Sequence, residues 1–403
     1  MSITIIESLK QVQDDMIQTT RKLCDINSGS YNSEGLANVA DELKILFSTL
    51  FTDIKEVPLK PIQRVTASGK IEEIELRPSL VFKRNPEAPM QLLMTGHYDT
   101  VFPVTSSFQS TWIEGEYLRG PGVADMKGGL VMLKHALDYT FSQPYGEKVG
   151  VTLIISPDEE IGSPSSAELL VELAKTADFG LTYEPALADG TLAGARKGSG
   201  NFSIVVKGKS AHAGREFFNG RNAMIAAAEV SLKLAQLSDQ ETGITVNVAA
   251  IDGGGPPNVV PDTAVIRFNI RIEQPAQMSI LNEINSIIDS VASNSGCDIE
   301  LHGTFNRPPK PMTERQQWMF ELLKDVGQDL GLAIAWKPTG GCCEGNNLAA
   351  AGLINIDTLG VRGGAIHSED EFAVLDSFAE RAALSAALIK RLLDITLEGE
   401  HSC

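Results

Sequence analysis

Apolar runs and helix-patterned segments alternate along this chain. Runs at residues 79–83, 90–95, 151–156 and 179–183 predict strands. The part at 152–155 is rich in β-branched residues and has no turn signal, so it predicts a strand buried on both faces. Apolar residues at helical spacing predict helices at residues 8–25, 35–51, 130–137, 165–176, 313–330 and 375–393. Together these elements predict an α/β fold with a mostly parallel mixed sheet flanked by helices.

A second pattern occupies the middle of the chain, after Ala195. Its predicted order is strand, helix, strand, strand, helix, strand, at residues 202–206, 222–237, 244–250, 264–272, 278–293 and 298–302. This βαββαβ order is that of a ferredoxin-like domain. The proline-rich segment 307–311 predicts a hinge. We therefore expect a catalytic domain made of residues 1–196 and 310–403, interrupted by a lid and dimerisation domain at residues 197–309.

Length and charge narrow the class of protein. At 403 residues the chain is long for a single core, which agrees with two domains. Hydrophobic residues make up 43% and charged residues 21%, a composition typical of a soluble globular protein. The formal charge of −18 repels phosphate backbones and disfavours nucleic-acid binding. Part of the acidic excess is available for metal binding.

The cysteines indicate the cellular compartment. The chain has five cysteines with neither a CxxC spacing nor an even number, and a disulfide between adjacent Cys342 and Cys343 would be strained. Residues 1–7 lack the basic and apolar regions of a signal peptide, and no stretch is apolar for about 18 residues. We therefore expect reduced thiols in a cytoplasmic protein with no membrane partner.

Three adjacent acids, Asp158, Glu159 and Glu160, follow the predicted strand that ends at Ser156. Pro157 stops the strand, so the acids should lie at a strand end, where a cleft is expected. Carboxylates that point inward together repel each other and need a cation, usually a metal pair. The alternative is a solvated acidic turn.

Other candidate ligands also follow predicted strands or lie in loops. His97 ends a strand with Asp99 near enough to fix its tautomer, although a structural histidine is an alternative. Asp125 lies in a glycine-rich loop and could bridge two metals, or it could cap a helix. Glu184 and His367 could equally belong to ordinary surface loops. Taken together, His97, Asp125, Glu160, Glu184 and His367 form the nitrogen and oxygen set that suits paired zinc or similar ions.

Five segments then resemble, in order, the motifs of the dizinc exopeptidase and deacylase family. They are Gly96–Val101 (GHYDTV), Gly120–Gly129 (GPGVADMKGG), Asp158–Gly162 (DEEIG), Gly208–Gly214 (GKSAHAG) and Gly363–His367 (GGAIH). The family includes glutamate carboxypeptidase, acetylornithine deacetylase, succinyl-diaminopimelate desuccinylase and aminoacylase. The glutamate carboxypeptidase type is the most similar.

The resemblance implies a role for each candidate. Asp125 would bridge two divalent ions, which we expect to be zinc, with cobalt and manganese as alternatives. Glu160 and His367 would bind one ion, and His97 and Glu184 the other. Glu159 would be the general base, and Asp99 would orient His97. The resemblance further implies a cis peptide bond between Asp125 and Met126.

In the middle domain the resemblance implies a homodimer. His212 matches a histidine that reaches the partner's active site and stabilises the oxyanion. Asn258 and Arg271 match positions that bind the carboxylate of the substrate, for which an arginine fork is suited. Lys197 is a further candidate for this role. Without the resemblance, Arg271 would be interpreted as a solvent-facing strand residue.

One segment departs from the family pattern. Where many relatives have Gly-Gly-x-Ser-Asp-Gly-Asn, this chain has Gly340–Asn346 with the sequence GGCCEGN. This difference leaves the exact substrate open. We expect a hydrolase that cleaves the amide of a short peptide or N-acyl amino acid with a free carboxylate. Release of C-terminal glutamate or a similar residue is one form of this activity. A biosynthetic deacylase and a catalytically silent metal-binding scaffold are the alternatives.

Overall fold

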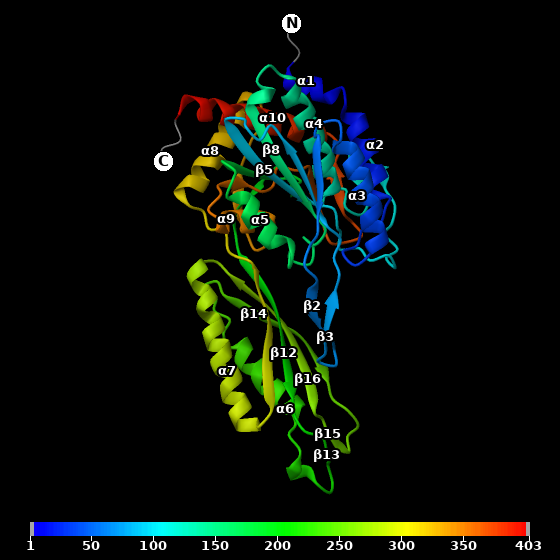
Figure 1. Ribbon diagram of the computed structural model, residues 1–403, viewed down its shortest axis with the longest axis vertical. Coiled ribbons are helices and arrows are strands. Elements are labelled where there is room, and N and C mark those ends of the chain that lie inside the picture. Colours follow the sequence, from blue (N-terminus) through cyan, green and yellow to red (C-terminus); the bar gives the residue numbers. More distant parts are fainter. Residues whose placement is uncertain (1–3, 400–403) are drawn as a thin grey trace.

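The computed structural model describes residues 4–399 and has two bodies joined by two linkers (Figure 1). Both ends of the described chain belong to the larger body, and the central part forms the smaller one. The described residues do not include Cys403. They also do not include residues 1–3, which begin the segment that was searched for a signal peptide. Across residues 4–399, no helix is both long and apolar enough to cross a membrane.

The larger body is built on a six-stranded sheet. Its strands, in spatial order, are β1 (Asp53–Val57), β4 (Ser79–Arg84), β8 (Val149–Ser156), β5 (Met90–His97), β9 (Phe179–Thr182) and β19 (Asn355–Ile356). Strand β4 runs antiparallel to its two neighbours, and the pairs from β8 to β19 are parallel. The prediction of a mostly parallel mixed sheet is therefore confirmed.

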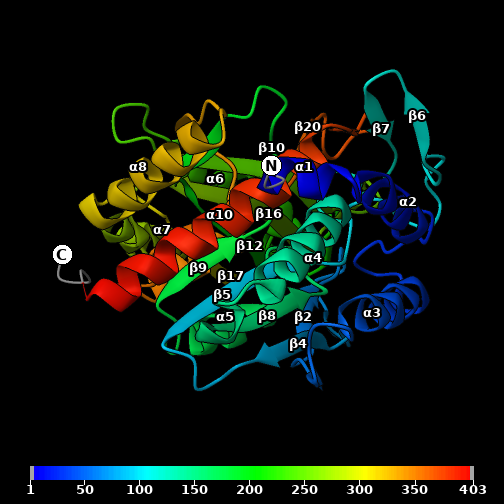
Figure 2. The same ribbon diagram turned by 90° about the horizontal axis from the view of Figure 1, so that it is seen from above.

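Helices cover both faces of this sheet (Figure 2). Leu92 and Met94 point to one face, where they join the large core beneath several helices: α2 (Gln13–Cys24), α3 (Ser33–Phe47), α4 (Lys127–Ser142), α8 (Glu314–Asp329) and α10 (Ser377–Glu398). Leu93 and Ile154 point to the other face, beneath α5 (Ser166–Ala174) and α9 (Glu344–Ala350). Because successive side chains of a strand alternate between faces, both faces require apolar residues. The continuous apolar runs in the sequence reflect this double burial.

Several elements differ from the predictions. The helix predicted at residues 8–25 is two helices, α1 (Ile5–Lys10) and α2. The hairpin of β2 (Ile62–Val65) and β3 (Ile71–Ile74) was not predicted, because half of its strand residues are polar and most are exposed. A second sheet, also not predicted, has the order β10 (Ala186–Leu187), β20 (Arg362–Gly364), β21 (Phe372–Val374), β7 (Tyr117–Arg119) and β6 (Trp112–Glu114).

The smaller body, called the lid below, contains the predicted βαββαβ order. Its antiparallel sheet has the spatial order β14 (Thr245–Gly253), β16 (Thr263–Ile272), β12 (Gly198–Lys207) and β17 (Asp298–Arg307). Helices α6 (Ala223–Ala235) and α7 (Ile280–Ser295) pack on one face and share an apolar core with the sheet. A short pair, β13 (Ala211–His212) and β15 (Val259–Val260), lies at the free end of the lid (Figure 1).

The two linkers run side by side, because Arg196 and Lys310 form an antiparallel bridge. The Arg196 Nε and Lys310 Nζ atoms both contact Oδ2 of the buried Asp357, at 2.7 and 2.9 Å. The β2–β3 hairpin adds a third contact, since Val65 packs against Val205 and Val265 of the lid sheet. The lid is thus attached to the larger body at the hinge and along one face.

Candidate metal centre and active site

The candidate ligands meet at one edge of the central sheet. His97 is the last residue of β5, Glu160 follows the end of β8, and Glu184 follows the end of β9. These three strands are parallel neighbours, so their carboxyl ends lie side by side. In α/β sheets this edge is the usual place for a functional crevice.

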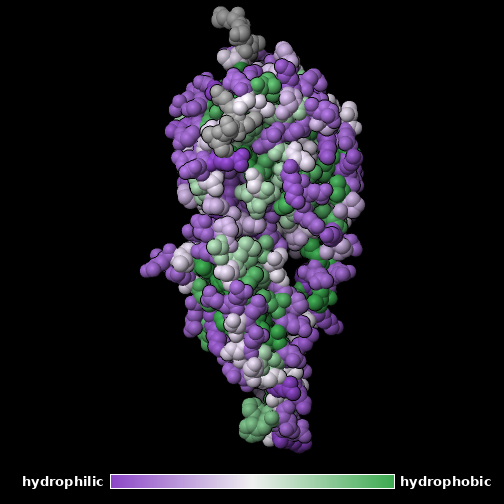
Figure 3. Space-filling view, turned by 60° about the vertical axis from the view of Figure 1, so that its left-hand side comes forward, coloured by the Kyte–Doolittle hydropathy of each residue, from purple (hydrophilic) through white to green (hydrophobic). Residues whose placement is uncertain are grey.

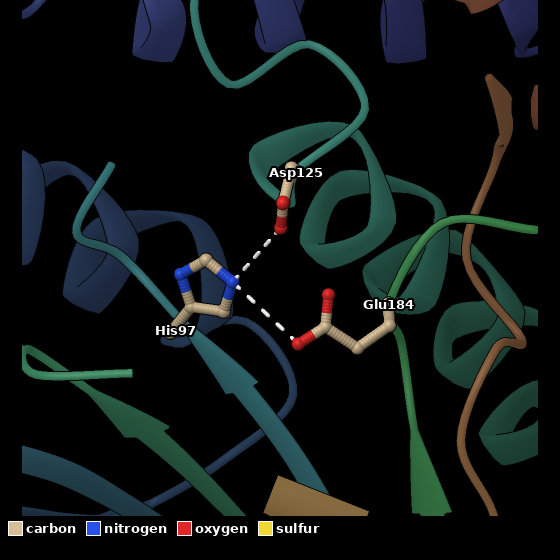
Figure 4. Close-up of side chains that lie close together, drawn as sticks. All are labelled: His97, Asp125 and Glu184. Carbon is tan, nitrogen blue, oxygen red and sulfur yellow. Dashed lines mark hydrogen bonds and ion pairs between the residues drawn. The ribbon is translucent and has the colours of Figure 1, made fainter. Parts of the chain in front are cut away.

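The first group of candidate ligands consists of His97, Asp125 and Glu184, whose ligand atoms lie within 4.8 Å of one another (Figure 4). The Nε2 atom of His97 lies 3.1 Å from Oδ1 of Asp125 and 3.7 Å from Oε1 of Glu184. Each of the three residues is buried. An ion bound between them would have one nitrogen and two oxygen ligands.

The second group shares Asp125 and adds Glu160 and His367. The Nε2 atom of His367 lies 3.3 Å from Oδ2 of Asp125 and 3.1 Å from Oε2 of Glu160. The two oxygens of Asp125 therefore face different groups. The structure thus brings together all five residues that the sequence suggested, in the two sets expected for a bridging aspartate.

The loop before α4 holds Asp125 in place. The carboxylate of the buried Glu371 accepts hydrogen bonds from the backbone N–H groups of Gly122, Ala124 and Asp125, at 3.0–3.1 Å. The peptide bond between Asp125 and Met126 is cis, as the resemblance implied. Sequence reasoning gave Glu371 no role, because its contacts lie about 250 positions away along the chain.

The carboxylate of Asp99 orients the loop that carries the acids. It accepts the backbone N–H groups of Glu159 and Glu160 at 3.2 Å and the hydroxyl of Ser30 at 2.7 Å. Asp158 has a different role, since it accepts the N–H groups of Ser165 and Ser166 at the start of α5. Asp158 therefore supports the loop and does not belong to either ligand group.

Electrostatics in the cluster are dominated by burial and by Asp125. Burial opposes protonation of His97, but hydrogen bonds to Asp125 and neighbouring acids outweigh it and raise the pKa of His97 well above its usual value. Hydrogen bonds to Asp125 and Glu160 raise the pKa of His367 to about 11. Burial and then the charge on Asp125 raise the pKa of Glu184 to about 7 and also raise that of Glu160. Added positive charge would therefore stabilise these carboxylates.

The chemistry of the cluster fits a pair of divalent ions. Two imidazole nitrogens and three carboxylates, grouped around one shared aspartate, form a donor set that suits zinc and similar metals. A bound pair supplies positive charge that acidifies water and polarises a carbonyl.

Glu159 lies beside the cluster and is not part of either ligand group. Its side chain is 10% exposed, and its Oε1 atom accepts a hydrogen bond from Nη2 of Arg307 at 2.6 Å. Arg307 is the last residue of β17, and sequence reasoning regarded it only as the start of the hinge.

A cavity of about 340 Å³ opens next to the cluster and has Glu159, Glu184 and His367 in its wall. Its remaining wall includes Lys337, Cys342 and Cys343 from the segment that departs from the family pattern and from the strand before it. Burial raises the pKa of the Cys343 thiol well above its usual value, which favours the neutral thiol over the reactive thiolate. The departure therefore changes the wall of the cavity and leaves the ligand set complete.

The predicted substrate-binding residues of the lid lie in different places. The Nη1 atom of Arg271 lies 3.3 Å from Sγ of Cys342, at the wall of the cavity. The ammonium of Lys197 contacts Glu273 at 3.0 Å and the carbonyl of Gly243, so it is directed toward lid residues.

His212 ends β13 and Asn258 directly precedes β15, the strand pair at the free end of the lid, away from the central sheet (Figure 1). The backbone N–H of Ala213, next to His212, donates to the carbonyl of Asn258 at 2.9 Å. These two predicted residues are therefore neighbours, but they do not lie beside the candidate metal ligands of the same chain.

Comparisons with known proteins identify the family of the chain. Residues 93–391 match the sequence profile of peptidase family M20/M25/M40. Carboxypeptidase G2 of Pseudomonas sp. (strain RS-16) is 25% identical and covers 96% of this chain and 92% of its own length. Succinyl-diaminopimelate desuccinylase of Psychrobacter sp. (strain PRwf-1) is 24% identical, with coverages of 81% and 84%. The fold matches that of a metallo-carboxypeptidase from Sulfolobus solfataricus with a TM-score of 0.73 at 18% identity, over 94% of this chain and 99% of the other.

Proposed function

This chain belongs to peptidase family M20/M25/M40, and we propose that it hydrolyses an amide bond in a short peptide or N-acyl amino acid that carries a free carboxylate. The observation that carries this proposal is the pair of ligand groups sharing Asp125, with Glu159 beside them. A metal pair next to an acid that is not a ligand suits the activation of water.

We assign the ligands as the two groups divide. His97 and Glu184 would hold one ion, Glu160 and His367 would hold the other, and Asp125, which both groups share, would be a ligand of both. Zinc fits this donor set, with cobalt and manganese as alternatives.

In the proposed reaction Glu159 removes a proton from the attacking water and passes it to the nitrogen of the leaving amine. The amide C–N bond breaks, and the products are a carboxylate and an amine. Glu159 suits this step because its side chain reaches the wall of the cavity while its Oε1 atom is held by Arg307.

The cavity beside the cluster is the proposed binding site for the substrate. Lys337 lines it, and Arg271 reaches the Cys342 side of its wall. A guanidinium and an ammonium favour a substrate with a carboxylate near the bond that is cleaved. We regard Lys197 as a weaker candidate for binding the substrate, because its ammonium group already forms an ion pair with Glu273.

The proposed enzyme is a homodimer through its lids, in which His212 and Asn258 of one chain reach the cavity of the other. Exposed apolar residues support a lid interface. Helix α6 carries Ile225 and Leu232, 67% and 69% exposed and seven positions apart, so they lie on one face. The free end of the lid also has an apolar surface (Figure 3). Phe218, in the turn that follows β13, is 96% exposed.

Two further proposals concern the cellular location of the protein and its binding partners. The free thiols of Cys24, Cys297, Cys342 and Cys343 agree with a cytoplasmic location. The formal charge of −18 is unfavourable for nucleic-acid binding, so we propose no such partner.

Two other candidate functions stand beside that of a carboxypeptidase-like hydrolase. A deacylase of biosynthetic intermediates is supported by the likeness to succinyl-diaminopimelate desuccinylase. A catalytically silent metal-binding scaffold is disfavoured, because a scaffold has no need for Glu159 beside a complete ligand set.

The deciding experiment is a substrate panel assayed with metal-loaded and metal-stripped protein. The panel contains acyl-glutamates, short peptides, acetylornithine and succinyl-diaminopimelate. We expect hydrolysis of at least one compound, loss of that activity on chelation, and recovery with zinc, cobalt or manganese. Activity that survives thorough metal removal would contradict the proposal, and the preferred compound separates carboxypeptidase from deacylase.

A further inference from the structure

Arg307 connects the lid to the interior of the larger body. Its backbone ends β17, where it pairs with Ser199 of β12 in the lid sheet. Its side chain is only 2% exposed and extends into the larger body. There Nη1 donates to Oδ1 of Asn347 in α9 at 2.6 Å, and Nη2 donates to Oε1 of Glu159 at 2.6 Å.

The guanidinium holds Glu159 by two atoms. Besides the bond to Oε1, Nη2 of Arg307 donates to the backbone carbonyl of Glu159 at 3.3 Å. Among residues 4–399 the other carboxylate oxygen, Oε2, has no hydrogen-bonding partner. Arg307 thus fixes one oxygen of Glu159 and leaves the other available for a proton.

A buried guanidinium loses its hydration, which is costly unless a counter-charge and hydrogen bonds compensate for it. Glu159 is the acid that forms an ion pair with Arg307 among the described residues. Asn347 fixes the second arm of the guanidinium, so the position of Glu159 depends on a residue at the end of a lid strand.

We propose that Arg307 is a positioning residue, which holds Glu159 in place for proton transfer. It thereby couples the position of Glu159 to the linker that follows β17. The inference rests on the proposed function, in which Glu159 moves the proton. It adds that the linker does more than return the chain to the larger body. A shift of the lid strand would move Arg307 and with it the free oxygen of Glu159.

Three variants and one control variant test this role. Arg307→Ala removes the hold on Glu159, and Arg307→Lys keeps the charge but loses the fork. Lys310→Met is the matched control, because it removes a buried cation from the same linker and leaves the hydrogen bonds of Glu159 intact. Asn347→Ala removes the second anchor of the guanidinium.

For Arg307→Ala we expect kcat to fall by about 10- to 100-fold, since small misplacements of a reacting group have effects of this size. KM and the metal content should stay close to wild type. The solvent deuterium isotope effect on kcat should rise, because proton transfer becomes slower. Added guanidinium ion should restore part of kcat, Arg307→Lys should be intermediate, and Lys310→Met should show none of these changes.

The outcomes separate this inference from the proposed function. Wild-type protein without chelator-sensitive hydrolysis overturns both. Active wild type with an unchanged kcat in Arg307→Ala overturns the inference alone. A lower kcat that Lys310→Met reproduces, with no rise in the isotope effect and no guanidinium rescue, shows a merely structural hinge and also overturns it. If Arg307→Ala does not fold, Arg307→Lys and Asn347→Ala decide by the isotope effect and by kcat against KM.

Discussion

The Nδ1 atom of His97 lies 3.0 Å from the backbone carbonyl oxygen of Asp99 and 3.4 Å from its side-chain Oδ1. Both acceptors favour a proton on Nδ1 and leave Nε2 free to face Asp125. The sequence suggested that Asp99 orients His97 through its carboxylate. In the structure the backbone carbonyl of Asp99 makes the shorter contact with His97. Its carboxylate also holds the loop that carries Glu159 and Glu160.

Asp99→Asn should weaken metal binding. Within residues 4–399, the hydrogen bonds of the Asp99 carboxylate come from donors, including the N–H groups of Glu159 and Glu160, and an amide NH₂ would be repelled by them. We expect metal affinity to fall by about 10- to 100-fold, as for other residues that orient metal ligands. Competition with a chelating dye measures it. Ser30→Ala, which removes one donor and keeps the carboxylate, is the control, and equal affinities for wild type and Asp99→Asn would contradict the assignment.

His367→Ala should remove one of two ions. His367 belongs only to the group with Glu160, and its side chain is 53% exposed, so the substitution should not disturb the core. Elemental analysis after dialysis should find about two ions per chain in wild type and about one in the variant. His302→Ala, in the lid and outside both groups, is the control. Two tightly bound ions in His367→Ala would argue against the division of ligands.

Local patterns were sufficient to predict much of the fold. The apolar run that includes Leu93 predicts β5 because both faces of that strand are buried. The ligands could be found for a related reason, since residues that follow neighbouring parallel strands must meet at one edge. His97 and Glu184 are examples.

The remaining contacts join positions far apart in sequence, where no local pattern exists. Arg307 and Glu159 are 148 positions apart, and Glu371 and Gly122 are 249 apart. The β2–β3 hairpin was missed because its strands are mostly exposed and lack an apolar face, apart from Val65. Only the placement of the lid explains why Val65 is buried.

Asp357→Asn should destabilise the hinge. The Asp357 side chain is fully buried and is shared by Arg196 and Lys310, so its loss leaves two buried cations without a counter-charge. We expect the unfolding free energy to fall by about 3–5 kcal/mol, measured from urea unfolding. Glu168→Ala breaks an exposed pair with Lys60 at 2.6 Å and should cost at most about 1 kcal/mol. Similar losses in both variants would contradict this account of the hinge.

His135 should make stability depend on pH. Burial, followed by the charge of Lys134, lowers the pKa of His135 below its ordinary value of 6.5. The unfolded chain therefore binds the proton more readily, so stability is lost as pH falls below about 6.5 toward the folded-state value. His135→Leu should lose less stability than wild type between pH 7 and pH 5, by at most about 1.4 kcal/mol per pH unit. Parallel stability curves for the two proteins would show that His135 does not titrate as argued.

Glu159→Gln should separate metal binding from turnover. Glutamine cannot take a proton at this position, so kcat should fall by about 10²- to 10⁴-fold while both ions stay bound. Its amide oxygen can still accept the hydrogen bond from Arg307, so the variant should unfold at a higher urea concentration than Glu159→Ala, which leaves that arginine without an acceptor. Kinetics, elemental analysis and urea unfolding of the three proteins test this. A near-normal kcat in Glu159→Gln would show that the reaction proceeds without a carboxylate at this position, and Glu159 would then not be the base.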